Sequence, residues 1–432
     1  MNATAAARPE ESDRGFGGGT PDQPVSGSER LIALDFIRGI AVLGILFANI
    51  TAFGHPLLAY FWPDALPGGG SETDRWIWLF QFGFVDGKFR GLFTLLFGAG
   101  MYLFMERVWA RNGSRWLQAR RLFWLMLFGI AHFFFLFIGD ILFLYSISGF
   151  AVLAMMRWRA RTQLRIGLAW YLIGSLAFTL AVGSQAALEG MPALRAQSPE
   201  SWQQVEQGWQ DQVETAETEA AVVRNGSFAD VVSYRAVEQS SQLALYAMIA
   251  AFETIPLMLV GIALFRFGFF AAALDRRKMR RWGWVGLALG SLVSLALGWW
   301  AVTRDFPPFL TQFVFNGPSA FPRLAMVLGL ASLLVLWAPA ASQTWLGSRL
   351  VAAGRMALSN YIGTSVVMVL VFQGWAGGLY GELDRASLLL VVLAAWALML
   401  AWSKPWLARF RYGPLEWLWR CLTYGRLVPM RR

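Results

Sequence analysis

The sequence predicts an all-α, polytopic membrane protein with about ten transmembrane helices, both termini in the cytoplasm and one helical external loop. Of its 432 residues, 56% are hydrophobic and 15% are charged, and the mean hydropathy is +0.47. Soluble domains carry about 25% charged residues. Apolar runs long enough to cross a bilayer recur along the whole chain, which is the pattern of a multi-pass protein.

Polar segments flank the predicted transmembrane domain. Residues 1–30 are rich in Gly, Pro, Ser and charge, so we expect a disordered cytoplasmic tail there. The transmembrane helical domain is expected over 31–403, and 404–432 is expected to form an amphipathic cytoplasmic tail. No clear signal-peptide cleavage site follows the first apolar run, which is therefore expected to stay as a span.

Ten segments are long and apolar enough to be predicted spans. The second of them is interrupted by "VDGKFRG", and we expect an interfacial helix followed by a span that begins near residue 90. The approximate bounds are 33–53, 77–105, 119–137, 140–157, 165–185, 243–265, 282–302, 321–339, 356–377 and 386–403.

The arginines predict the orientation of these spans. Every second loop is basic, and the alternate loops are short or acidic; the basic segments are 106–121, 157–165, 266–281 and the tail from 404. Cytoplasmic loops carry the excess of Lys and Arg, so both termini are expected in the cytoplasm. The net charge of +10 therefore indicates topology, and no nucleic-acid partner is expected.

The longest loop, about 186–242, is predicted to lie outside and to be helical. Pro199 after Ser198 favours a helix start, and Ser227 and Asp230 have the spacing of a capping box. The loop is interpreted either as a helical cap or as a solvated amphipathic spacer.

The residue counts restrict the chemistry of a site. The single cysteine, Cys421, excludes an internal disulfide and a cysteine-based metal cluster, and two histidines leave little for a histidine-based site. We therefore expect no metal or prosthetic group.

Charged and polar residues within or beside the spans are the candidates for function, because a charge at the bilayer centre costs at least ~2.5–3.5 kcal/mol. On the cytoplasmic side they form either helix-start ion pairs and anchors or an anion-binding mouth, since guanidinium groups suit phosphate. This set contains Asp35, Arg38, Arg355, Asn360, Glu416 and Arg420.

A second set is predicted near the outer side, as interface charges and hydrogen-bonded core residues or as parts of a site. Its members are Asn49, His55, Asp86, Lys88, Arg90, His132 and Asp140. Glu253 is expected near mid-depth, three residues before Pro256, as a functional carboxylate or as half of a buried ion pair.

Five motifs together resemble the YeiB-like family of bacterial inner-membrane proteins, which is described by a domain of unknown function. They are "LDFIRGIAVLGILFANI", "DGKFRGLFTLLFGAG", "GDILFLY", "GRMALSNYIGTS" and "GPLEWLWR", and the resemblance covers about residues 30 to 425. The chain is more distantly similar to the transmembrane acyltransferases of the heparan-glucosaminide N-acetyltransferase type. That likeness implies transfer of an acyl group from cytoplasmic acyl-CoA to an acceptor at the outer face.

The resemblance implies roles for the candidate residues. Many of those acyltransferases carry histidine at the position of Asn49, so the catalytic base here is expected to be His55 or His132. Asp35 and Arg38 would bind CoA phosphates at the mouth. Asn49 lies about 16 Å further along the helix at ~1.5 Å per residue, a suitable reach for a pantetheine arm.

Three functions are consistent with these residues. An acyltransferase would use the imidazole as general base, oriented by Asp86 or Asp140, with Asn49 as an oxyanion donor. A solute transporter or exporter would use Glu253, Lys88 and Arg90, and a scaffold or sensor would use the external loop. The expected partners are membrane lipid and a small-molecule or glycan acceptor, with homo-oligomerisation left open.

Overall fold

The computed structural model describes residues 32–66 and 70–432. The regular secondary structure of this part of the chain consists of helices. The predicted tail over 1–30 lies outside the described residues. The elements are α1 (Ile32–Gly54), α2 (Leu58–Phe61), η2 (Pro63–Ala65), α3 (Glu72–Phe84), α4 (Lys88–Ala110), α5 (Trp116–Phe135), α6 (Leu142–Met155), α7 (Ala160–Gly190), α8 (Pro192–Gln197), α9 (Pro199–Asn225), α10 (Phe228–Val237), α11 (Gln242–Ile249), η3 (Ala250–Thr254), α12 (Ile255–Arg266), η4 (Phe269–Ala271), α13 (Arg276–Thr303), α14 (Pro308–Asn316), α15 (Ala320–Ala341), α16 (Trp345–Arg355), α17 (Ala357–Phe372), α18 (Arg385–Arg409) and α19 (Pro414–Tyr424).

Seven helical segments of the described chain are long and apolar enough to cross a membrane, which establishes the multi-pass class. They are Ile32–Gly54, Glu72–Ala110, Ala160–Gly190, Gln242–Arg266, Arg276–Thr303, Pro308–Ala341 and Arg385–Arg409. An eighth span results if α16 and α17, bent by 88° against each other, count as one. The remaining two expected spans correspond to α5, with 20 residues, and the short apolar helix α6, with 14, so the count of ten stays a prediction.

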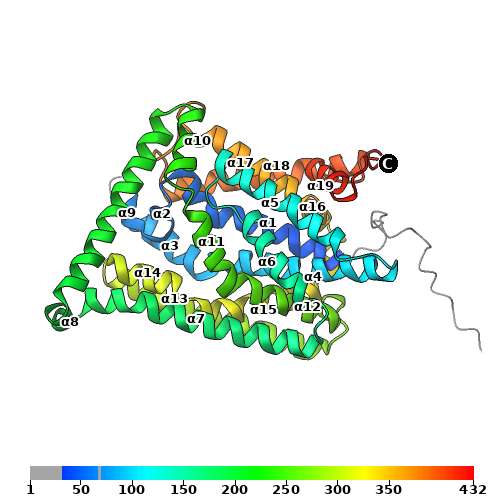
Figure 1. Ribbon diagram of the computed structural model, residues 1–432, viewed down its shortest axis with the longest axis horizontal. Helices are drawn as coiled ribbons and strands as arrows, with labels where there is room; N and C mark the ends of the chain where they lie inside the picture. The colour runs from blue at the N-terminus through cyan, green and yellow to red at the C-terminus, as the bar shows by residue number, and fades with distance from the viewer. Residues whose placement is uncertain (1–31, 67–69) are drawn as a thin grey trace, which may run out of the picture.

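Helix α1 is the centre of the bundle (Figure 1) and packs against α4, α15, α16, α17 and α18. Helices α1 and α16 approach each other closely because each contributes a glycine to their contact. A Cβ atom on Gly39 would lie 2.1 Å from the carbonyl oxygen of Leu350, and one on Gly354 would lie 1.8 Å from that of Asp35. Small residues allow such close approach of membrane helices.

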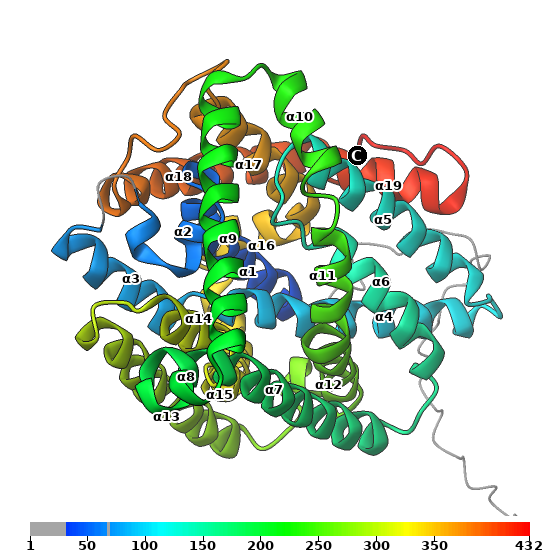
Figure 2. The same cartoon turned by 60° about the vertical axis from the view of Figure 1, so that its left-hand side comes forward.

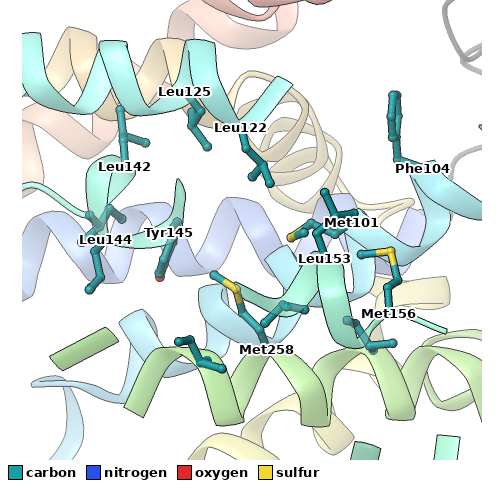
Figure 3. Packing of buried hydrophobic residues seen from close by; sticks show 14 of the residues in the cluster. Met101, Phe104, Leu122, Leu125, Leu142, Leu144, Tyr145, Leu153, Met156 and Met258 are labelled. Carbon is teal, nitrogen blue, oxygen red and sulfur yellow. The ribbon is translucent and has the colours of Figure 1, made fainter. Parts of the chain in front are cut away.

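The largest apolar cluster joins α4, α5, α6 and α12. Figure 3 shows Met101 of α4, Leu122 of α5 and Leu153 of α6 meeting in this cluster, with Met258 of α12 beneath them. Gly149 lets α5 and α4 approach α6, because a Cβ there would lie 2.6 Å from Leu122 and 3.4 Å from Met101. This packing holds α6 against the middle of α4.

Helix α9 crosses one end of the bundle, at the opposite end from α19 (Figure 1), and Figure 2 shows it running in front of α1 from α8 to α10. The predicted helix start at Pro199 and the capping box of Ser227 and Asp230 are both confirmed. The C-terminal end of α9 is fixed to the loop before α18, because the backbone N–H of Gly374 donates to the carbonyl of Val223 at 3.0 Å.

Glu219 is the buried carboxylate beneath this cap. Its oxygens accept from the backbone N–H of Leu57 and the hydroxyl of Tyr380, both at 3.5 Å. Burial raises the pKa of Glu219 to about 7, against the opposing effect of the nearby Arg235 guanidinium. The cap therefore buries a group that titrates near neutral pH.

Replacing Gly39 with Ala should destabilise the protein by roughly 1–3 kcal/mol, because the added methyl group forces α1 and α16 apart. Gly363→Ala on α17 is the matched control, since a Cβ there meets nothing within 4 Å. Unfolding followed by tryptophan fluorescence in nanodiscs measures both variants. Equal stability of the two would contradict the close crossing.

The buried carboxyl group at position 219 makes stability depend on pH. A group whose pKa rises from 4.5 when unfolded to about 7 when folded binds its proton more tightly in the folded state, so stability falls as pH rises between these values. Glu219→Gln should remove this loss, and its stability relative to wild type should be greater at pH 8 than at pH 5 by roughly 1–3 kcal/mol. The exposed Glu214→Gln on the same helix should show no such pH dependence.

Candidate active site

A pocket of about 210 Å³ lies between α1, α4, α5, α6, α16, α17 and α19. Its charged rim is formed where α1 begins and α19 passes, at the end of the bundle remote from α9 (Figure 1). The rim joins two acidic residues, Asp35 and Glu416, with five arginines: Arg38, Arg107, Arg121, Arg355 and Arg420. Five of the six residues predicted on the cytoplasmic side thus lie around one opening. The exception is Asn360.

Local contacts place the rim arginines. Arg38 forms an ion pair with Asp35 one turn earlier, with 2.6 Å between Nη1 and Oδ1. The Arg121 guanidinium lies over the ring of Trp419 at 4.2 Å, and Arg420 lies over Tyr412 at 4.5 Å. Guanidinium groups stack on aromatic faces and still present a planar edge to anions, so this rim suits phosphate groups.

Glu416 shapes the rim by holding the start of α17. The chain bends at Met356 between α16 and α17, and the backbone N–H groups of Leu358 and Ser359 donate to Oε1 of Glu416 at 2.7 and 3.1 Å. The Ser359 hydroxyl also donates to Oε2. The carboxylate satisfies N–H groups that a helix start leaves without partners. Its role is thus to tie α19 to the bend.

Beyond the rim the pocket becomes apolar. Its walls include Met101 and Phe104 of α4 and Leu125 of α5, which also belong to the core of Figure 3. Ile141 and Tyr361 line the far part of the pocket. The hydroxyl of Tyr361 accepts from the backbone N–H of Ile141 at 3.3 Å, so α17 and the start of α6 form one wall.

His132, Asp140 and Ser365 form a buried cluster directly behind this wall. Nδ1 of His132 lies 2.9 Å from Oδ1 of Asp140, and Nε2 lies 2.8 Å from the Ser365 hydroxyl. The His132 ring lies 4.8 Å from the Tyr361 ring, between centroids. The other oxygen of Asp140 accepts from the backbone N–H of Phe143 at 2.6 Å, which fixes the carboxylate at the start of α6.

In this cluster the imidazole lies between a carboxylate and a hydroxyl. The negative charge of Asp140 beside Nδ1 favours a proton on that nitrogen, which leaves Nε2 as an acceptor, although the two atoms do not meet the angle of a hydrogen bond. An imidazole so oriented can remove a proton from a hydroxyl or amine. The structure therefore pairs His132 with Asp140, one of the two carboxylates proposed to orient an imidazole.

His55, the second candidate base, lies elsewhere. It follows the end of α1 and its Nε2 is 2.7 Å from the carbonyl of Leu383, so it ties α1 to the loop before α18. Burial lowers the pKa of His55 to about 4, and the ring is neutral at pH 7. Asn49 is half-buried one and a half turns earlier on α1, and neither residue lines the pocket.

Glu253 is enclosed by two arginines. Its Oε2 lies 2.7 Å from Nη2 of Arg90 and 3.6 Å from Nη1 of Arg323. Glu253 stands in the π-helical turn η3, three residues before Pro256 of α12. The cluster touches the pocket through Tyr145, whose hydroxyl donates to the Arg90 carbonyl at 3.1 Å.

Asp86 and Lys88 are buried at the turn between α3 and α4. Asp86 accepts from the Gln81 amide at 3.2 Å, and the Lys88 ammonium donates to the carbonyl of Phe82. Asp86 is therefore not placed against either histidine by a described contact. The neighbouring Arg385 donates to Thr51 at 3.2 Å and to the carbonyl of Ala59 at 2.8 Å, and its backbone N–H donates to Asp74.

Asn360 has a local partner set on the α18 side of the bend. Its amide donates to the Ala353 carbonyl and the Ser403 hydroxyl, both at 3.1 Å, and its oxygen accepts from Trp402 at 2.9 Å. These bonds use the side chain to join α16, α17 and α18. Asn360 does not line the pocket with the arginine rim but lines a second pocket of about 200 Å³ between α17 and α18.

Sequence reasoning missed several members of these clusters. Ser365 ends the quoted motif "GRMALSNYIGTS", and only the fold shows that it faces His132. Arg107 and Arg121 belong to the basic segment 106–121, which predicts a cytoplasmic loop and does not indicate a site. Arg323 and Arg385 stand at or near the start of apolar helices, where arginine is commonly a membrane anchor. Within residues 32–66 and 70–432, no three His, Cys, Asp or Glu side chains gather as a metal site.

Comparison with known proteins gives uncharacterised relatives. Residues 264–426 match the family described as "Protein of unknown function (DUF418)". The chain is 34% identical over 410 residues to the uncharacterized protein YeiB of Escherichia coli (strain K12), covering 93% of this chain and 98% of that one. It is 29% identical over 429 residues to the uncharacterized protein YxaH of Bacillus subtilis (strain 168), covering 95% and 98%. No solved structure matches.

Removing the Glu253 carboxylate from between the two arginines should lower the stability of the protein against unfolding. Glu253→Gln leaves Arg90 and Arg323 close together without their counter-charge, and breaking such a buried pair costs ~3–5 kcal/mol. Adding Arg90→Gln to this variant should recover part of the loss, because one uncompensated charge disappears. Urea unfolding in detergent micelles measures the effect, with the exposed Glu206→Gln as control. Wild-type stability of Glu253→Gln would show that the carboxylate has no structural task.

Proposed function

The chain belongs to the YeiB-like family, and from the geometry of its pocket we propose that it is a membrane acyltransferase that uses acyl-CoA. One observation carries this proposal. A single pocket has five arginines at its rim, and its far wall is formed by Ile141 and Tyr361, which separate it from the His132–Asp140 pair.

The two ends of the pocket suit the two ends of an acyl-CoA molecule. The rim arginines bind the phosphate groups by charge-assisted hydrogen bonds, and the apolar walls accommodate the pantetheine arm and the acyl chain. The thioester is then carried toward Tyr361. His132 acts as the general base for the acyl acceptor, and Asp140 orients the imidazole.

The proposal includes an orientation in the membrane. The basic loops and the arginine rim lie on the cytoplasmic side of the bacterial inner membrane, where acyl-CoA is made available, and both termini lie on that side. The cap formed by α9 then faces outward. The acceptor, a glycan or small molecule, approaches from there.

Solute transport is the second candidate, and it rests on Glu253. A carboxylate within a membrane bundle is a candidate for proton or ion coupling, and the π-helical turn at Glu253 is a common feature of functional sites. Arg90 and Arg323 both neutralise it, however, which supports a structural ion-pair cluster. Under transport, loss of Glu253 would abolish solute flux and acyl-CoA would not bind.

Acyl-CoA should bind the purified protein in nanodiscs, and Arg38→Ala and Arg121→Ala should each weaken binding by roughly 5- to 50-fold. A hydrogen bond to a charged group contributes ~1.5–3 kcal/mol, and part of it is replaced by water when the arginine is removed. Thermal shift and calorimetry with CoA, acetyl-CoA and palmitoyl-CoA measure the affinity, which should also fall with rising salt.

The control is Arg276→Ala, an exposed arginine at the first residue of α13 that does not line the pocket. It should bind as wild type does. Failure of folded wild-type protein to bind any CoA species would reject the acyltransferase proposal and leave transport as the leading function. Equal losses in all three arginine variants would instead indicate a general charge effect.

A further inference from the structure

Three polar clusters lie in the interior of the described chain: the Arg90–Glu253–Arg323 cluster, the Glu219 cluster under α9, and Ser365 with His132 and Asp140. In the first two, each carboxylate is matched by a nearby arginine, which accounts for its burial. The third contains a hydroxyl, an imidazole and a carboxylate in sequence. It is the cluster that contains a nucleophile.

We propose that Ser365 is the nucleophile that first receives the acyl group, so that transfer proceeds through an acyl-serine enzyme; this rests on the proposed acyltransferase function. The geometry is the reason. The Ser365 hydroxyl lies 2.8 Å from Nε2 of His132, and Nδ1 of the same ring lies 2.9 Å from the Asp140 carboxylate. Nucleophile, base and orienting carboxylate within this reach form the signature of covalent acyl transfer.

The position of Ser365 on α17 supports this role. Ser365 stands one helical turn after Tyr361, whose side chain lines the far part of the pocket, and its hydroxyl also lies 3.2 Å from the Tyr361 carbonyl. The proposed transfer requires the Tyr361 ring to turn aside, because Tyr361 lines the pocket and its ring lies against His132. The three members come from α5, the start of α6 and α17, three elements that the core packing holds together.

The chemistry balances in two steps. In the first, the Ser365 hydroxyl gives its proton to Nε2 of His132 and its oxygen attacks the thioester carbonyl. The carbon–sulfur bond breaks, an ester forms on Ser365, and the CoA thiolate leaves with the proton from His132. In the second, the acceptor hydroxyl or amine gives a proton to His132 and attacks the ester, and the Ser365 oxygen takes that proton back.

A structural task is the competing explanation for Ser365. Buried serines on membrane helices often donate to the carbonyl four residues earlier, as Ser148 does to Leu144 at 2.7 Å on α6. Ser148 is equally buried and makes this bond without contacting an imidazole. It is therefore the matched control for Ser365.

The test uses full-length protein in nanodiscs and [1-14C]acetyl-CoA or [1-14C]palmitoyl-CoA without an acceptor. Wild type and Ser148→Ala should release close to one equivalent of CoA in a burst and retain an equal amount of label after denaturation. Proteolysis and mass spectrometry should place the acyl group on Ser365. The label should fall at least 20-fold in Ser365→Ala and in His132→Gln.

Ser365→Cys gives a second signature that a packing role would not produce. Its label should be a thioester that neutral hydroxylamine removes, whereas the wild-type ester should resist this treatment. A Cys421→Ser background removes the natural cysteine as an alternative acceptor.

The outcomes separate the two proposals. If acyl-CoA binds in an Arg38-dependent way but Ser365→Ala still releases CoA at the wild-type rate, the covalent step is wrong and the acyltransferase function stands. Label on His132 or another residue also overturns the proposal for Ser365. If folded wild type binds no acyl-CoA, both proposals fail.

Discussion

A charge inside a bundle of membrane helices is stable only where opposite charge or hydrogen-bond partners surround it, and this constraint organises the interior of the protein. Glu253 lies between Arg90 and Arg323, and Arg385 directs its N–H groups to Thr51 and to the carbonyl of Ala59. Each such contact joins helices that are distant in sequence. The polar interior thus fixes which helices are neighbours, because apolar faces in lipid discriminate poorly between partners.

The same constraint gives the pocket its unequal ends. At the rim, arginines of α1, α4, α5, α16 and α19 gather with the carboxylates of Asp35 and Glu416. Deeper in, the walls are apolar, and the His132–Asp140 pair lies behind Tyr361. A ligand with anionic groups at one end and a long apolar arm is matched by this order of environments. This match is the basis of the proposed use of acyl-CoA.

Much of the fold was predictable from the sequence because hydropathy identifies individual helices. The helix start at Pro199 and the capping box at Ser227 depend on local spacing, and both were predicted correctly. The pairing of His132 with Asp140 was half predicted, since eight residues and a tight turn separate them. The contact of His132 with Ser365 spans 233 positions, and no local pattern encodes it. Short or bent helices such as α6 and α17 also lack the length on which a count of spans relies.

The crossing of α1 with α16 and the hold of Glu416 on the start of α17 have a consequence for the order in which the protein is made. The pocket is built from the first described helix and from the last, since Asp35 and Arg38 belong to α1 and Glu416 and Arg420 to α19. A growing chain that still lacks α19 therefore has no closed pocket. During synthesis α1 must remain in the bilayer, with Gly39 uncovered, until α16 has been made. The pocket consequently closes only after α19 has been made.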